Sequence, residues 1–418
     1  MPRDLRLFNE ILSAVEENDF GEVRYLYETR LKKRERFSLA CVSELTSDLF
    51  SPDYDCVILA AAKLRDPTIL KYFLRKGVGV NFVGEPPFLS GSKVKVSALH
   101  VAINSSLPES VCLLVEANAD VNIPDHNGRT PLHLAVKRAD CDSCRLLLSH
   151  GATTCIPDKK GMTPLQIATK YGHVELVRIL LEHGAQVFQR GQKGASPLHI
   201  AAMEGHVPLI DLFSRYVDIN VRITCGQDAC EKAALHLAAE RGLYETVCFM
   251  IERFNADVNV LDSDHQTALH YVLRRSHDYR RMRPKEDFDS TAHFLLRCGV
   301  KLHQANSQGN TALHLAASNQ FHRVVDLLLY AGANSNVPNN RDQTARDLVP
   351  DFDVPMRQLF DKYENRSEHF PPMSPRPSAK LVQNGEARKL FPSCHPVSQF
   401  MYFSNNLSVA SGRTDSIL

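Results

Sequence analysis

The sequence predicts an all-α protein in which short helical units stack into a solenoid. The first observation is a recurring tetrad of the Thr-Pro-Leu-His type, whose leucine stands at Leu99, Leu132, Leu165, Leu198, Leu235, Leu269 and Leu313. The second is the period, because the first three steps between these leucines are each 33 residues. The third is size. A unit this short cannot bury its apolar face alone, so neighbouring copies have to cover it.

The stretch from Asn127 to Ala152 shows how one unit is encoded. Gly128 permits a tight turn, and Thr130 is suited to cap the start of a first helix. Pro131 then occupies the first helical position, where its missing N–H costs nothing. A second helix carries three consecutive leucines, and Gly151 follows it as a left-handed C-cap. The unit therefore reads as a turn followed by two short antiparallel helices.

The rest of the chain is divided by composition and apolar spacing. We expect a divergent helical capping repeat over 1–37, a linker over 38–55, repeats over 56–364 and a mostly disordered Pro/Ser-rich tail over 365–418. The repeat array is expected to carry three departures from regular length, at about 82–96, 222–232 and 275–286. A half-matching unit at 343–363 is expected to close the array.

The repeat pattern resembles the ankyrin repeat family. The resemblance rests on the period, the tetrads, the Gly-His pairs at Gly172 and Gly205, and the Ala-Asp-Val-Asn endings at Ala119 and Ala256. It covers roughly Cys56 to Tyr363. The resemblance implies a β-turn and two antiparallel helices per repeat, stacked into a solenoid. It also implies that the chain binds other proteins through its turn tips and concave helix face.

The net charge and the cysteine content limit which partners and which cellular compartment the sequence predicts. The formal net charge is +1, so no chain-wide field attracts nucleic acid, and no nucleic-acid partner is expected. No apolar run approaches a membrane span, and the first residues lack a secretory apolar region. Eleven scattered cysteines favour a reducing compartment, which predicts a cytoplasmic protein. Basic runs at Lys33 to Arg36 and around Arg280 also resemble nuclear import signals.

Residues with catalytic or metal-binding chemistry are interpreted as structural. Tetrad histidines belong to successive layers about 10 Å apart and cannot converge on one ion; they are His100, His133, His199, His236, His270 and His314. Cys141 and Cys144 have CxxC spacing but no second pair, and Cys144 stands at a core position. No nucleotide-binding or hydrolase motif is present. The sequence therefore predicts a non-catalytic chain without a cofactor or metal.

The candidate partner-binding residues lie where the repeat is broken or its surface is basic. The insertion carries Arg274, Arg275, Tyr279, Arg280, Arg281, Arg283 and Lys285, which suit an acidic segment or a phosphate group. A second basic patch is expected from Lys137, Arg138, Lys159, Lys160, Lys170 and Tyr171. For both sets the alternative is a solvated charged surface.

The last residues give a further candidate site. Ser416 stands two residues before the terminal Leu418, which resembles a PDZ-domain ligand that binds by strand addition. The sequence thus predicts a scaffold or adaptor that binds one or more proteins. The alternative is a substrate-recognition subunit of a ubiquitin ligase, although the SOCS box that such ankyrin proteins carry is not evident after Tyr363.

Overall fold

The computed structural model describes residues 3–31, 57–84, 95–189, 191, 194–223, 231–274 and 287–364. The expected linker over 38–55 and tail over 365–418 lie outside the described residues, as does most of each lengthened segment. Among the described residues, no helix is long and apolar enough to cross a membrane. The described residues belong to one compact unit, Met1–Glu368.

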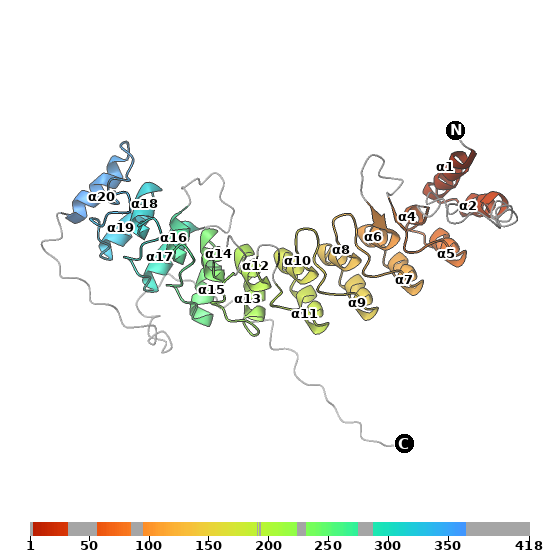
Figure 1. The fold of residues 1–418 in the computed structure, drawn as a ribbon, viewed down its shortest axis with the longest axis horizontal. Coiled ribbons are helices and arrows are strands. Elements are labelled where there is room, and N and C mark those ends of the chain that lie inside the picture. Colours follow the sequence, from red (N-terminus) through yellow and green to blue (C-terminus); the bar gives the residue numbers. More distant parts are fainter. Residues whose placement is uncertain are drawn as a thin grey trace, which may run out of the picture. The chain divides into compact units, whose positions relative to one another are not determined.

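The fold is a stack of helix pairs, arranged in two rows (Figure 1). We call the leading helix of each pair a first-row helix: α4 (Val57–Ala61), α6 (Ala98–Asn104), α8 (Pro131–Lys137), α10 (Pro164–Tyr171), α12 (Pro197–Glu204), α14 (Ala234–Glu240), α16 (Ala268–Leu273) and α18 (Ala312–Ser318). The second-row helices are α5 (Thr68–Arg75), α7 (Pro108–Glu116), α9 (Cys141–Ser149), α11 (Val174–Glu182), α13 (Val207–Phe213), α15 (Tyr244–Phe254), α17 (Phe288–Arg297) and α19 (His322–Tyr330). The predicted helical-repeat solenoid is confirmed.

Other elements lie at the ends of the stack. At the N-terminal end, α1 (Arg3–Glu16) packs on α2 (Phe20–Leu26), and a π-helical turn, η1 (Tyr27–Leu31), follows. At the C-terminal end, α20 (Val354–Glu364) packs on α19 and buries Met356 and Phe360 completely. Residues 343–349, which should form the first helix of a regular last unit, form turns instead.

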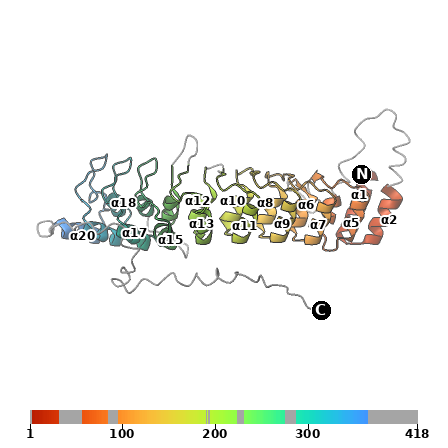
Figure 2. The ribbon, with the colours of Figure 1, turned by 90° about the horizontal axis from the view of Figure 1, so that it is seen from below.

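The fold also contains a small strand pair. β1 (Val83–Gly84) pairs antiparallel with β2 (Val96–Ser97), at the base of the lengthened turn expected at 82–96. The ladder leads directly into α6, which begins at the residue after β2. Elsewhere the turns project from one side of the helix layers (Figure 2).

From α6 onward, the start of each first-row helix is fixed by the tetrad itself. In α8 the backbone N–H of Thr130 donates to Nδ1 of His133 at 3.0 Å, which satisfies one donor at the start of the helix. The other ring nitrogen, Nε2, then donates to the Met162 carbonyl of the following layer at 3.1 Å. Gln166 has the same two roles in α10. Its side chain accepts from the Thr163 N–H and donates to the Ala195 carbonyl. The tetrad therefore both caps its own helix and joins two layers.

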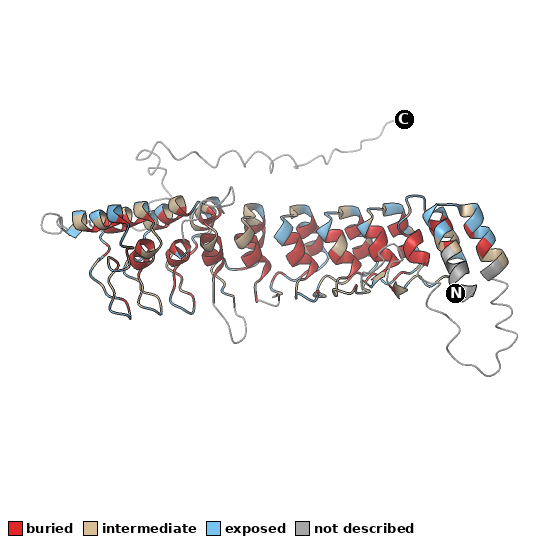
Figure 3. Cartoon of the chain, turned by 90° about the horizontal axis from the view of Figure 1, so that it is seen from above, coloured by how far each residue is buried: buried red, intermediate tan, exposed pale blue. Residues whose placement is uncertain are grey.

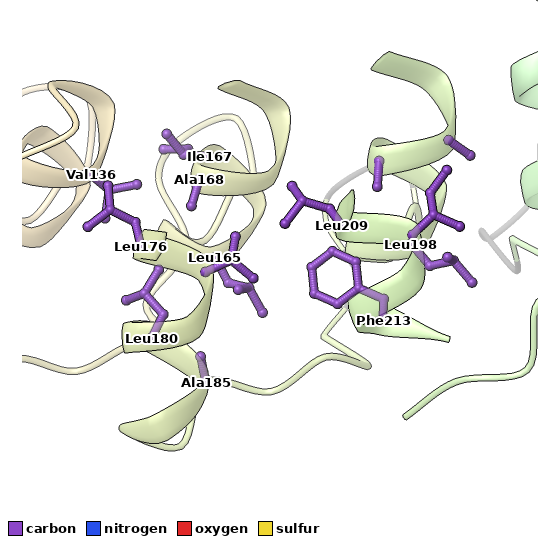
Figure 4. Close-up of a cluster of buried hydrophobic side chains, with 14 of the residues drawn as sticks. Val136, Leu165, Ile167, Ala168, Leu176, Leu180, Ala185, Leu198, Leu209 and Phe213 are labelled. Carbon is purple, nitrogen blue, oxygen red and sulfur yellow. The ribbon is translucent and has the colours of Figure 1, made fainter. Parts of the chain in front are cut away.

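The core runs between the two rows through the whole stack (Figure 3). Leu165, Leu180, Leu198, Leu209 and Phe213 belong to one such cluster, drawn in Figure 4, and each is almost fully buried. Their side chains come from first-row and second-row helices of two neighbouring layers. Because each layer contributes to the core of the next, a single layer has no complete core of its own.

Candidate protein interaction surface

Few positions of a first-row helix remain available to a partner. In α8 the residues of the tetrad and the following Ala135 and Val136 are buried, which leaves Leu134 half-buried and Lys137 and Arg138 exposed. In α8 these positions follow the tetrad histidine by one, four and five residues; in most other layers the first of them is buried and only the last two are accessible. Together with the turn tips, the same positions in every layer form what we call the first-row face. The side chains four and five residues after the histidine lie outside the repeated tetrad and differ between layers.

The first-row face over α8 and α10 is basic and partly aromatic. Lys137 and Arg138, at the end of α8, occupy the same positions as Lys170 and Tyr171 at the end of α10, and the two helices pack against each other. Tyr171 is 48% exposed, and its ring stacks on His173 with centroids 5.9 Å apart. The amino groups of Lys137 and Lys170 have no carboxylate partner in the described part of the chain. These cations are therefore available to an external anion.

Arg138 is held in place by neutral groups. Its guanidinium donates to the Ser106 hydroxyl from Nε at 3.2 Å and from Nη2 at 2.8 Å, and to the Asn104 side-chain oxygen at 3.3 Å. Both acceptors lie at the end of α6, in the preceding layer. The contacts fix the orientation of the side chain but leave its positive charge uncompensated. Such a preorganised cation loses little side-chain entropy when it binds an anion.

Lys159 and Lys160 lie at the opposite end of α10 from Lys170, in the turn tip that precedes the helix. The Lys159 N–H donates to the Asn127 carbonyl of the previous turn at 2.9 Å. That close approach requires Gly128, where a Cβ atom would stand 3.1 Å from Lys159 N at a φ of +73°. A helix of this length spans about 12 Å, so the candidate residues form two basic rows rather than one cluster.

The acidic residues near these rows are buried and bonded to the backbone. Oδ1 of Asp125 accepts from the N–H groups of Asn127 and Arg129, both at 2.8 Å. Asp158 repeats the arrangement one layer on, accepting from the N–H groups of Lys160 and Met162 at 2.9 Å. These carboxylates shape the turns and are not positioned to pair with the exposed lysine amines.

Layers further along the chain pair their charges internally. Glu204 of α12 binds Arg241 at the end of α14, with Nη1 and Oε2 3.2 Å apart. Lys232 lies 3.0 Å from Glu240 and sits 4.5 Å above the centre of the Tyr271 ring. Sequence reasoning missed this cluster. The residue that could have indicated it is Tyr271. The position directly after the tetrad is Val, Leu or Ile in every other copy.

The cluster around Tyr271 extends into the buried turn. The Tyr271 hydroxyl donates to Oδ2 of Asp262 at 2.6 Å, and the ring lies against His236 with centroids 5.3 Å apart. Tyr271 is only 1% exposed. Because these groups satisfy one another, the face over α14 and α16 offers fewer free charges than the face over α8 and α10.

The insertion candidates are only partly visible. Arg274 caps the C-terminal end of α16 and is exposed. The other insertion residues lie outside the described residues: Arg275, Tyr279, Arg280, Arg281, Arg283 and Lys285. Ser416 and Leu418 lie outside them as well.

The tetrad histidines have the structural role that the sequence indicated. Nε2 of His100, His133, His199, His236 and His314 each meets a backbone carbonyl of the next layer at 2.9–3.2 Å. His270 is the exception. Its Nε2 is buried near the carbonyls of Gln304 and Asn310 but meets neither in hydrogen-bond geometry. Burial lowers the pKa of His270 to about 4.

The thiols and acids provide no evident reactive centre among the described residues. Cys144 is fully buried in the core, and burial raises the pKa of its thiol. Burial also raises the pKa of Cys141, the other member of the CxxC pair. A thiol with a raised pKa is a poor nucleophile and a poor metal ligand at neutral pH. Within the described ranges, no group of three His, Cys, Asp or Glu side chains is arranged to hold a metal ion.

These features define a helical-repeat protein whose accessible side chains lie on a rigid stacked frame. Residues 57–158 and 153–224 match the family described as ankyrin repeats (3 copies), and residues 231–263 and 308–340 match the single ankyrin repeat. The matches together span more than half of the chain, which therefore belongs to the ankyrin repeat family. Ankyrin repeats are generally protein–protein interaction modules, and proteins built from them are typically non-catalytic.

Proposed function

We propose that this chain is a non-catalytic adaptor that binds a protein partner on its first-row face, centred on α8 and α10. The observation that carries the proposal is the group of exposed cations there. Lys137 and Lys170 have no ion-pair partner in the described part of the chain, and Arg138 is positioned by neutral oxygens alone. None of these side chains belongs to the repeated tetrad. Unpaired, preorganised charge beside exposed aromatic surface is typical of a recognition site.

Site-specific photo-crosslinking tests where the partner binds. A photoreactive amino acid is introduced in place of Tyr171 on the first-row face or, as the control, in place of Arg178. Arg178 is exposed on α11, in the same layer but on the second row. After irradiation in cells, we expect specific protein adducts from position 171 and not from position 178. Adducts from position 178 alone, or from neither position, would refute this placement of the site.

The insertion that begins at Arg274 is proposed as a second contact with an acidic partner. Its support is the density of arginine in the sequence, since a guanidinium matches carboxylate and phosphate geometry. Charge reversal at Arg280, Arg281 and Arg283 should weaken capture of a partner identified by crosslinking. Capture at the wild-type level would remove the insertion from the binding site.

The terminal Ser416 and Leu418 are proposed as a PDZ-type ligand that lets the chain join two proteins. Tethering two binding modules raises their effective concentration for each other. A synthetic peptide ending at Leu418 should bind a panel of PDZ domains, and one extra residue after Leu418 should abolish binding because the terminal carboxylate is then lost. A peptide that binds no member of the panel would contradict this role.

We place these interactions in the cytoplasm, a compartment that suits the free cysteines of the described residues.

A further inference from the structure

We infer that the first-row face over α8 and α10 takes an extended acidic segment of a partner protein, with carboxylates at every third residue. The inference rests on the proposed function and adds the chemistry and spacing of the ligand. It depends on the arrangement of cations, the acids that could neutralise them, the surface between the two rows, and the repeat distance of the layers.

The cations bracket the ends of the first-row helices. Lys137, Arg138 and Lys170 lie at the C-terminal ends of α8 and α10, and Lys159 and Lys160 lie at the turn tip before α10. The row at the helix ends provides one or two positive groups per layer over two consecutive layers. A ligand that crosses both layers along this row meets the groups in succession.

Among the described residues of the first-row face over α8 and α10, no accessible acidic side chain neutralises these cations. Asp125 and Asp158 are 9% and 8% exposed, and each is bonded to two backbone N–H groups of its own turn. In the layers of α12 and α14, by contrast, Glu204 and Glu240 are already bound to basic side chains. Among these four layers, the uncompensated positive charge therefore lies over α8 and α10.

The surface beside the cations is partly apolar. Leu134 is half-buried and Tyr171 is 48% exposed, whereas Ile167 is buried, at 8% exposure. These residues lie one turn before, or next to, the lysines on the same helix faces, because positions three and four apart are neighbours. An acidic segment that also carries aliphatic residues or proline would contact this surface between its carboxylates.

The distance between layers selects the spacing of those carboxylates. Packed helices lie about 8–10 Å apart, so equivalent lysines recur at about that interval. A polyproline II segment has three residues per turn and rises about 3.1 Å per residue, which places every third side chain on one side at about 9 Å intervals. Carboxylates at every third position therefore stay in register with Lys137 and Lys170.

The basic C-terminal segment does not suit this face. Residues 365–418 contain six Lys and Arg residues and three Asp and Glu residues. Residues 38–55 form an acidic stretch without any Lys or Arg, containing Glu44, Asp48, Asp53 and Asp55. It lies outside the described residues and is treated as a competing occupant in the test below.

The test uses fluorescently labelled peptides and the full chain, with binding followed by fluorescence anisotropy at low ionic strength. The probe peptide carries Glu at every third position, with proline and leucine between. We expect it to bind, and we expect K137E combined with K170E to weaken binding about ten-fold or more. The matched control, R178E combined with K301E, makes the same charge change at exposed residues away from this face and should retain wild-type affinity.

Two control peptides separate the parts of the inference. A peptide of the same composition with its Glu residues contiguous should bind more weakly, and equal binding would overturn the spacing. A peptide with Gln in place of Glu should not bind, and equal binding would overturn the acidic ligand. Equal loss of binding in both charge-reversal variants would show that only net charge matters and would likewise overturn it.

A third variant addresses the competing occupant. Replacing Glu44, Asp48, Asp53 and Asp55 with the corresponding amides should leave the affinity for the probe unchanged if the face is open to a separate partner. An increased affinity would show that the chain's own acidic stretch occupies the face. If the peptides do not bind but position 171 still forms crosslinks, only the proposed ligand is overturned. If the peptides do not bind and the crosslinks are also lost, the proposed function is overturned as well.

Discussion

His270→Gln tests whether a buried, neutral tetrad histidine makes the stability of the stack depend on pH. The imidazole of His270 is 1% exposed, and burial lowers its pKa from 6.5 to about 4. Gln166 shows that a glutamine fits the same position, because it caps its own helix and bonds to Gln189 and Ala195 in the next turn. The substitution therefore keeps the shape and hydrogen-bonding capacity of the site while removing the titrating group.

The size of the effect follows from the difference in proton affinity between the folded and unfolded chain. Between about pH 6.5 and pH 4 the unfolded chain protonates this histidine while the folded chain keeps it neutral. The free energy of unfolding therefore has its full value above pH 6.5 and falls as the pH drops toward 4. With about 1.4 kcal/mol for each pH unit, the loss due to His270 alone is about 3 kcal/mol.

Urea unfolding at pH 7.5 and pH 4.5, followed by circular dichroism, measures this loss. Over that interval wild type should lose more stability than His270→Gln. The difference should be most of the loss of about 3 kcal/mol expected from His270. His293→Gln, at an exposed position of α17, is the control and should behave like wild type. If His270→Gln and wild type lose the same stability in acid, the buried neutral imidazole is not what makes the fold sensitive to pH.

Three further substitutions test packing, backbone conformation and the closing helix by urea unfolding. Leu147→Ala, at a fully buried site, should cost about 2–5 kcal/mol, and a change near zero would contradict the stacked core. Gly172→Ala should cost about 1 kcal/mol or more, because φ is +74° and the new Cβ would stand 2.7 Å from the His206 ring; an unchanged midpoint would refute this. Arg346→Ala removes exposed ion pairs from Arg346 to Asp361 and Glu364 of α20 and should cost at most about 1 kcal/mol, an effect that 1 M salt should abolish.

The regular layers could be predicted from the sequence because their determinants are local. The cap at Thr130, the proline at the first helical position and the buried histidine lie within four consecutive residues. Cys144 could likewise be placed in the core from its position in the second helix, and its side chain is fully buried. The period then extends the same interpretation to every copy.

Contacts between layers could not be predicted in the same way. The pairing of Lys232 with Glu240 over Tyr271 joins residues from two layers beside a lengthened turn, where the period no longer fixes the relative positions. The division of the basic residues into two rows also depends on three-dimensional geometry. Lys160 and Lys170 are ten positions apart in the chain, yet they lie at opposite ends of one helix.

The cross-layer bonds of the tetrad histidines give the stack a direction. Apart from that of His270, each Nε2 takes its acceptor from the layer that follows, and His314 takes the last one from Gln343 at 3.2 Å. The final tetrad has Asp347 where a histidine would stand, and within the described residues its carboxylate accepts from the N–H and hydroxyl of Thr344 in its own turn. Shortening the chain from its C-terminal end thus orphans a buried donor, whereas shortening it from the N-terminal end does not. Fragments that keep the C-terminal layers are accordingly the better starting points for isolating a stable part of this protein.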